Sequence, residues 1–125
     1  MQPFVSVVIP TFNAPGHIAA CVDAVRGQDY PRDRYEVIVV DNGPVEGDER
    51  FLRQVGSDGD GVSVRYVWEP RPGSHLARHA GITAAAGDII AFTDDDTEVS
   101  PGWLTALMVC FEDPKVGAAG GPVAT

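Results

Sequence analysis

Short runs of β-branched and aromatic residues alternate along the chain with segments whose apolar residues recur at helical spacing. Four such runs predict strands: 5–9, 35–40, 62–68 and 88–92. Helical spacing predicts three helices: 16–25, 74–86, and one that begins at Ser100-Pro101 and presents Trp103, Leu104, Leu107, Met108 and Phe111 on its apolar face. A weak helix over 49–55 and a fifth, glycine-rich strand over 116–123 complete the prediction, with Gly87 as the C-cap of the helix over 74–86.

The alternation of strands and helices predicts an α/β fold: a mostly parallel, doubly wound, Rossmann-like sheet with helices on both faces. No linker or internal repeat interrupts residues 1–125, which predicts a single domain. Ligands of such sheets bind at the carboxyl ends of the strands, so the residues that directly follow the predicted strands are the candidates for chemistry.

Composition narrows the choice of partners. The formal net charge is −9, and a chain this acidic does not attract nucleic acid through a general basic field. A phosphate-bearing substrate stays possible, because a bound cation reverses the local sign of the field. No stretch approaches the roughly 18 consecutive apolar residues of a membrane span, and no secretory signal begins the chain, so we expect a cytoplasmic location.

The two cysteines, Cys21 and Cys110, have no metal-type spacing, and both are expected to be buried apolar residues on helices. Three common nucleotide and hydrolase signatures are missing from the sequence: G-x-G-x-x-G, G-x-x-x-x-G-K-[ST] and G-x-S-x-G. A dinucleotide site of that type, a P-loop and a hydrolase elbow are therefore disfavoured.

Asp94, Asp95 and Asp96 directly follow a predicted buried strand. In an extended segment the first and third carboxylates point to the same side. Three adjacent anions repel one another unless a cation or solvent screens them, and Mg²⁺ or Mn²⁺ takes oxygen ligands together with substrate phosphates. The alternative is a solvated acidic loop before the next helix. The position at a strand exit favours the metal site.

Three further sites carry two interpretations each. Asp41 also follows a strand. Its carboxylate either accepts hydrogen bonds from a base or ribose, or accepts one from the backbone of its own turn. Arg78 follows a glycine-containing loop near a helix start, where it meets a diphosphate or is a plain surface arginine. His75 and His79 share a helix face at metal-ligand spacing but lack an accompanying H-E-x-x-H motif, so surface or packing roles are favoured.

Four segments in order resemble the family 2 glycosyltransferases, which have the GT-A fold. They are 5–13 (VSVVIPTFN), 35–43 (YEVIVVDNG), the segment 73–81 with Ala77-Arg78, and 87–96 (GDIIAFTDDD), which resembles the strand carrying the DxD motif. Pro101-Gly102-Trp103-Leu104 fits the helix after that strand. The resemblance covers nearly the whole chain and implies a nucleotide-sugar donor linked to UDP, GDP or TDP.

The resemblance also implies roles for single residues. Thr11 and Asp41 would contact the nucleobase, with Pro10 and Asn13 shaping that wall of the site. Arg78 would lie near the phosphates. Asp94 would face the ribose, Asp95 is the ambiguous middle member, and Asp96 would bind the Mn²⁺ or Mg²⁺ ion that bridges the diphosphate. Pro44 and His79 stand where the family usually has Ser and Asn, which leaves base preference and local loop shape open.

The resemblance predicts an inverting, metal-dependent transfer of a sugar to an acceptor hydroxyl of a carbohydrate, lipid-linked or protein substrate. Members of the family continue past this point with the acceptor site and the general base, so we expect this chain to be the donor-binding part. Peripheral placement at the inner face of a membrane is the alternative to a free cytoplasmic location. Two rivals stay open: a non-catalytic nucleotide-sugar-binding module, and a receiver-like or phosphoryl-transfer domain. Against the second, Lys115 is the only lysine.

Overall fold

The computed structural model describes residues 3–12, 15–43 and 61–110. Its elements in chain order are β1 (Val5–Thr11), α1 (Pro15–Arg26), the 3-10 helix η1 (Arg32–Arg34), β2 (Tyr35–Asp41), β3 (Ser63–Trp68), α3 (Ser74–Ala84), β4 (Ile89–Phe92) and α4 (Trp103–Cys110). Asn13, Pro44, the helix predicted over 49–55 and the strand predicted over 116–123 lie outside the described residues.

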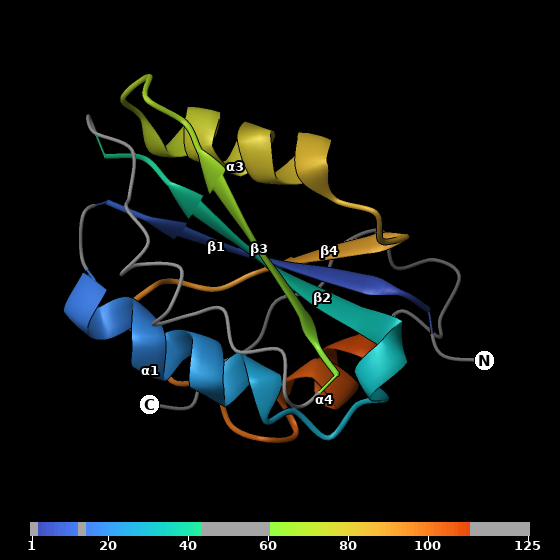
Figure 1. The fold of residues 1–125 in the computed structure, drawn as a ribbon. Helices are drawn as coiled ribbons and strands as arrows, with labels where there is room; N and C mark the ends of the chain where they lie inside the picture. The colour runs from blue at the N-terminus through green and yellow to red at the C-terminus, as the bar shows by residue number, and fades with distance from the viewer. Residues whose placement is uncertain (1–2, 13–14, 44–60, 111–125) are drawn as a thin grey trace.

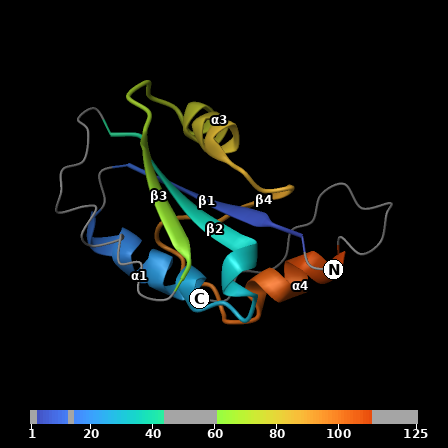
Figure 2. The same cartoon turned by 45° about the vertical axis from the view of Figure 1, so that its right-hand side comes forward.

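The four described strands form one parallel sheet in the order β3-β2-β1-β4. Figures 1 and 2 show α3 on one face of this sheet and α1 and α4 on the other. The predicted parallel, doubly wound α/β architecture is therefore confirmed. Because the strands run the same way, the carboxyl ends of β1, β2 and β4 meet at one edge, where the residues predicted to carry chemistry lie.

Strand alternation separates the core into two clusters. Val5, Val7 and Ile9 of β1 point toward α1 and α4, whereas Val8 points toward α3. The residues of β2 divide in the same way, and all seven are buried. Burial of aliphatic area on both faces supplies roughly 25 cal/mol for each Å² removed from water, which makes β1 and β2 the most firmly held strands. They form the base of the cleft described below.

The buried carboxylate of Glu36 holds the segment just after the C-terminal end of α3. Glu36 accepts hydrogen bonds from Ser6 Oγ (2.6 Å) and Ala86 N (2.9 Å), and it pairs with Arg65 at 2.9 Å. The predicted helix over 74–86 ends at Ala84, and Gly87 is not its C-cap. Gly87 instead packs so closely on β1 that an added Cβ would lie 2.7 Å from the Ser6 nitrogen. Close backbone approach, not a left-handed turn, explains this glycine.

Two predicted boundaries are also corrected. β1 continues through Pro10 to Thr11. Of the described strands only β2 pairs with it beyond Val8, and a residue without an N–H is tolerated at such an open edge. α4 begins at Trp103 and not at Ser100-Pro101. A free backbone amide in its first turn is satisfied by a residue just after α1: Gln28 Oε1 accepts a hydrogen bond from Leu104 N at 2.8 Å.

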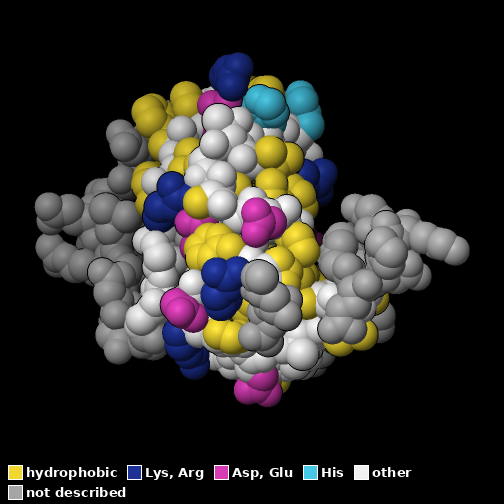
Figure 3. Space-filling model, turned by 90° about the vertical axis from the view of Figure 1, so that its right-hand side faces the viewer, with side chains coloured by type: hydrophobic (Ala, Val, Ile, Leu, Met, Phe, Trp, Pro, Cys, Tyr) yellow, Lys and Arg dark blue, Asp and Glu magenta, His cyan; other side chains and the backbone are white. Residues whose placement is uncertain are grey.

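The surface differs from expectation at one cysteine. Cys21 is buried as predicted, but Cys110 is exposed, because the apolar stripe of α4 runs through Leu104 and Met108 and leaves its last residue facing outward. On the face shown in Figure 3, acidic and basic side chains are interspersed among hydrophobic ones. Among the described residues, no helix combines the length and apolarity that crossing a membrane requires.

Candidate functional site

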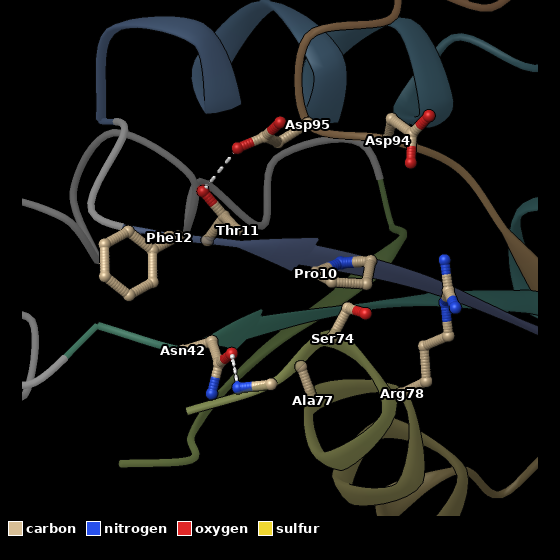
Figure 4. A pocket seen from close by; sticks show the side chains of 10 residues that line it. Pro10, Thr11, Phe12, Asn42, Ser74, Ala77, Arg78, Asp94 and Asp95 are labelled. Carbon is tan, nitrogen blue, oxygen red and sulfur yellow. Dashed lines mark hydrogen bonds between the residues drawn. The ribbon is translucent and has the colours of Figure 1, made fainter. Parts of the chain in front are cut away.

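A cleft of about 440 Å³ lies at the carboxyl ends of the strands (Figure 4). Four parts of the chain contribute to it: the end of β1, the turn after β2, the start of α3, and the turn after β4. Its lining residues are Pro10, Thr11, Phe12, Asn42, Gly73, Ser74, Ala77, Arg78, Asp94 and Asp95. In Figure 4 the Phe12 ring lies at one end of the group, and Arg78 with Asp94 lies at the other. The cleft therefore has an aromatic end and a charged end.

The charged end is built on the turn formed by residues 94–96, called the acidic turn from here on. Thr97 N donates to Asp94 O at 3.2 Å, which closes a turn directly after β4. The segment is therefore not extended, so the strand alternation on which the same-side expectation for Asp94 and Asp96 rests does not apply here. Asp94 and Asp96 are both exposed, but only Asp94 and Asp95 line the cleft. Thr97 Oγ1 lies 3.4 Å from Asp96 Oδ1.

Two neighbouring elements hold the acidic turn. Thr11 Oγ1, at the end of β1, donates to Asp95 Oδ2 at 2.8 Å (Figure 4). Cys21 Sγ, on α1, donates to Asp94 O at 3.2 Å. Burial, and after it the carboxylates of the acidic turn, raises the pKa of the Cys21 thiol to about 12, so the thiol keeps its proton and remains a donor. The first two aspartates are thus fixed by contacts from outside the turn.

Asp41 lies beside the cleft but is not among its lining residues. Its side chain is 5% exposed and both oxygens are engaged: Tyr66 OH donates to Oδ2 at 2.6 Å, and Gly43 N donates to Oδ1 at 2.9 Å. The second of these is the bond to its own turn that the sequence left open. Its neighbour Asn42 faces the cleft instead.

Arg78 is exposed on the first turns of α3, and Figure 4 shows its guanidinium pointing toward Asp94. Together with Pro10, Asp94, Phe92, Thr93 and Thr97 it also lines an adjoining recess of about 100 Å³. Thr93 Oγ1 is buried and has no hydrogen-bond partner, which is uncommon for a buried hydroxyl. Among the described residues, the adjoining recess therefore has an unsatisfied buried hydroxyl beside the acidic turn.

The opposite wall of the cleft ends in the loop after β3. Glu69, in that loop, is nearly buried and pairs with the exposed Arg71. The hydrogen bond from Arg71 lowers the pKa of the Glu69 carboxyl below its ordinary 4.5, against the effect of burial. This pair is local to the loop. It leaves Arg78 as the arginine that lines the cleft.

The acidic turn fits a hard divalent ion that takes few protein ligands. Its donors are carboxylate oxygens, which Mg²⁺ and Mn²⁺ prefer. Among the residues that the structure describes, no three His, Cys, Asp or Glu side chains converge as a metal-binding group, and this includes the exposed His75 and His79. A cation held here therefore needs further ligands from substrate phosphates and water, as Mg²⁺ usually has.

The structure brings together Pro10, Thr11, Arg78, Asp94 and Asp95 from the sequence-predicted site. Sequence reasoning assigned no role to Phe12, Asn42 or Ser74, which also line the cleft. Phe12 carries the clearest signal that was available: a large aromatic side chain placed directly after a buried strand, where it is 62% exposed. Large exposed apolar side chains in a cleft commonly mark a binding site.

The fold and the cleft together define a doubly wound α/β domain, a class whose members bind ligands at the carboxyl ends of parallel strands. Within that class the chain belongs to glycosyl transferase family 2, whose sequence profile matches residues 6–125. Glycosyltransferase AglE of Haloferax volcanii is 37% identical over 121 residues, covering 97% of this chain and 40% of the relative. An N-acetylglucosaminyltransferase of Mesorhizobium japonicum is 32% identical over 132 residues, covering 98% and 29%.

Solved structures agree with the fold. The mannosyltransferase PcManGT from Pyrobaculum calidifontis, in complex with GDP-Man and Mn²⁺, superposes with a TM-score of 0.84 at 31% identity, over 94% of this chain and 34% of that one. S. aureus TarS 1-349 superposes with a TM-score of 0.72 at 22% identity, over 95% and 37%. The expected GT-A fold is confirmed. The chain spans well under half the length of these relatives.

Proposed function

We propose that this chain is the donor-binding part of an inverting glycosyltransferase that transfers a sugar from a nucleoside-diphosphate sugar to an acceptor hydroxyl, with Mn²⁺ or Mg²⁺. One observation carries the proposal. A single cleft joins an exposed aromatic ring to an arginine and two carboxylates. A planar base suits the Phe12 end, and a diphosphate with its cation suits the end formed by Arg78 and Asp94.

The base end holds the first group of proposed contacts. Pro10, Thr11 and Asn13 shape the wall that follows β1, and Asp41 accepts a hydrogen bond from the base. For this contact Asp41 Oδ2 must exchange the Tyr66 hydroxyl, now 2.6 Å away, for an N–H of the base. Such an exchange keeps the carboxylate bonded at every stage, as a buried anion requires.

The phosphate end holds the second group. Arg78 binds the phosphates, since its fork of N–H donors matches their oxygens. Asp94 faces the ribose side, Asp95 keeps its bond from Thr11, and Asp96 is the metal ligand. When bound, the cation neutralises charge on the diphosphate leaving group. The start of α3, at Ser74, adds backbone N–H groups and the positive end of a helix dipole to the same region.

The reaction is a direct displacement at the anomeric carbon. The acceptor oxygen forms the new bond to that carbon on the face opposite the diphosphate, and the old bond breaks with its electron pair leaving on the nucleoside diphosphate. The acceptor proton passes to a general base outside this chain. The residues of this chain act on the leaving side: they orient the donor and bind the charge that develops on the departing phosphate oxygen.

The donor class follows from the cleft and from one relative. PcManGT, with 31% identity and the same fold, was solved with GDP-Man and Mn²⁺. This supports a GDP-sugar with Mn²⁺ as the first donor to test here, with UDP- and TDP-sugars as the alternatives. Cytoplasmic placement, with peripheral association at a membrane as the alternative, and a carbohydrate, lipid-linked or protein acceptor complete the proposal.

Calorimetric titration of the chain with GDP and with UDP, each with and without Mn²⁺, tests the proposal. We expect binding that requires Mn²⁺ and is lost in Asp94→Ala and Asp96→Ala. Asp88→Ala is the matched control, because Asp88 is an exposed carboxylate at the opposite end of the same strand. Mn²⁺-dependent binding that survives in both acidic-turn variants would refute the site assignment.

A transfer assay separates the enzyme from a non-catalytic binding module. The full-length protein is incubated with a radiolabelled GDP- or UDP-sugar, Mn²⁺ and candidate acceptors, and released nucleoside diphosphate is followed. Turnover that disappears in Asp96→Ala identifies an enzyme. Tight binding by the full-length protein without release of nucleoside diphosphate identifies a binding module.

A further inference from the structure

The Asn42 side chain links the turn after β2 to the loop that leads into α3. Its Nδ2 donates to Glu69 O at 2.8 Å and to Arg71 O at 2.7 Å, and its Oδ1 accepts from Gly73 N at 3.2 Å. The residue is 7% exposed and lines the cleft. An amide is well matched to these partners, because it offers two donors and an acceptor on one short side chain.

Gly73 connects this link to the helix that carries the cleft residues. It is the N-cap of α3, with φ +130°, and its carbonyl accepts from Leu76 N (3.1 Å) and Ala77 N (3.2 Å). Asn42 therefore holds the residue on which the first turn of α3 closes. Ser74, Ala77 and Arg78 reach the cleft from the following turns, so their position depends on where that turn is held.

The turn on the other side of Asn42 is itself fixed. Tyr66 OH donates to Asp41 Oδ2, Trp68 Nε1 donates to Gly43 O at 3.0 Å, and the backbone of Asp41 accepts from Glu69 N at 2.8 Å. The end of β3 thus clamps both residues that flank Asn42. Asn42 therefore fixes the start of α3 relative to the edge of the sheet. Its role is to position other residues, and it does not itself act on the reacting atoms.

We propose that Asn42 is a positioning residue: it fixes the loop 69–73 and the first turn of α3 against the ends of β1 and β2, and so sets the affinity of the cleft for a nucleoside diphosphate. This inference rests on the proposed function. Small misplacement of binding groups is costly, and an error of about 1 Å can lower rates by about a hundredfold. We expect an effect on binding that exceeds the effect on stability.

Calorimetry with GDP and with UDP in the presence of Mn²⁺ tests the proposal on the wild type, Asn42→Ala and Asn42→Asp, with thermal melts of each. The aspartate variant keeps the acceptor for Gly73 N but sets a carboxylate against two carbonyl oxygens. Gln28→Ala is the matched control. The Gln28 amide also donates to two carbonyls, of Ala24 and Ser100, and accepts from Leu104 N, but it lies at the α1–α4 contact and outside the cleft.

Both Asn42 variants should weaken nucleotide binding by about tenfold or more. Gln28→Ala should lower the melting temperature comparably and leave the dissociation constant within about twofold of wild type. In NMR spectra the Gly73 amide should exchange slowly in the wild type and in Asn42→Asp, and fast in Asn42→Ala. That signature reports the link itself, which a general loss of stability does not reproduce.

Unchanged affinity in Asn42→Ala overturns the proposal, and so does an equal loss of affinity in Gln28→Ala. If neither Asn42 variant folds, the wild type decides: a Gly73 amide that exchanges as fast as a free peptide overturns it. A wild-type chain that binds neither nucleotide refutes the proposed function itself and this inference with it. Binding by the wild type together with unaffected Asn42 variants refutes only the role of Asn42.

Discussion

Replacing Gly81 by alanine should loosen the contact between α3 and the sheet. Gly81 is buried in the middle of α3, where the helix crosses β1 and β2. A methyl group placed there would collide with Val8 Cγ1 and would lie 3.1 Å from Val8 Cγ2 and 3.3 Å from Val40 Cγ2. Both valines are fully buried in central strands, so neither can turn aside without displacing other core atoms.

Two opposing effects decide the size of the change. Alanine in place of glycine favours a helix interior by about 0.8–1 kcal/mol. Against this, the collision drives the helix outward by roughly 1 Å to restore ordinary contact distances of about 3.5–4.0 Å, and a gap of that size forfeits a quarter to a half of the dispersion attraction around it. Overpacking of this kind costs about 1–3 kcal/mol. We expect the upper end of this range here, and a net loss of about 2 kcal/mol.

Urea denaturation followed by circular dichroism measures this loss as a lower midpoint with an unchanged slope, and thermal melting should show a fall of roughly 8 °C. Gly102→Ala is the matched control, since nothing lies within 4 Å of an added Cβ there. It should leave stability unchanged or raise it by less than about 1 kcal/mol. A Gly81→Ala variant as stable as wild type would show that the close approach of α3 to Val8 is wrong.

Three other predictions concern single side chains. Thr93→Val removes a buried hydroxyl without a partner and should raise the free energy of unfolding by about 1 kcal/mol in urea titrations; a decrease would mean that the hydroxyl is satisfied. An aromatic disulfide reagent should modify the exposed Cys110 at once and Cys21, whose pKa is raised to about 12, only after denaturation; two fast thiols would contradict the burial of Cys21. Arg71 holds the pKa of Glu69 below 4.5, so their pair stabilises the fold above that pH and is lost as the pH falls through the lowered value. The stability difference between wild type and Arg71→Gln should therefore be full at pH 7 and vanish in acid, and a difference that persists in acid would assign it to another contact.

The sheet was predictable because its signal is local. In β1 and β2, runs of valine and isoleucine leave few alternatives to a strand buried on both faces, and parallel pairing follows from the helices between them. The errors fall at boundaries set by tertiary contacts. The end of α3 is decided by the bond of Glu36 to Ala86 N, and the start of α4 by the amide of Gln28, and neither partner is near in sequence.

The sequence predicted where in the fold the candidate site lies, but not all of the side chains that line it. The sequence places Asp41 and Asn42 after the same strand, but which of them faces the cleft depends on Tyr66 and Trp68, more than 20 residues away, which engage Asp41 and Gly43. Adjacent residues in a turn point in different directions, and no local pattern specifies the choice. For the same reason a motif identifies the strand end correctly and leaves the contributing side chain undetermined.

The acidic turn shows how this changes the electrostatic argument. From sequence, three adjacent carboxylates need either a cation or solvent to screen their repulsion. In the structure Asp94 and Asp96 are exposed to solvent, a hydrogen bond from Thr11 stabilises Asp95, and the backbone of Asp94 accepts a hydrogen bond from Cys21. Solvent and these contacts therefore screen the repulsion in the turn, which is the alternative to a cation that the sequence left open. A cation held by Asp96, as proposed, would therefore take much of its affinity from the phosphates that arrive with it.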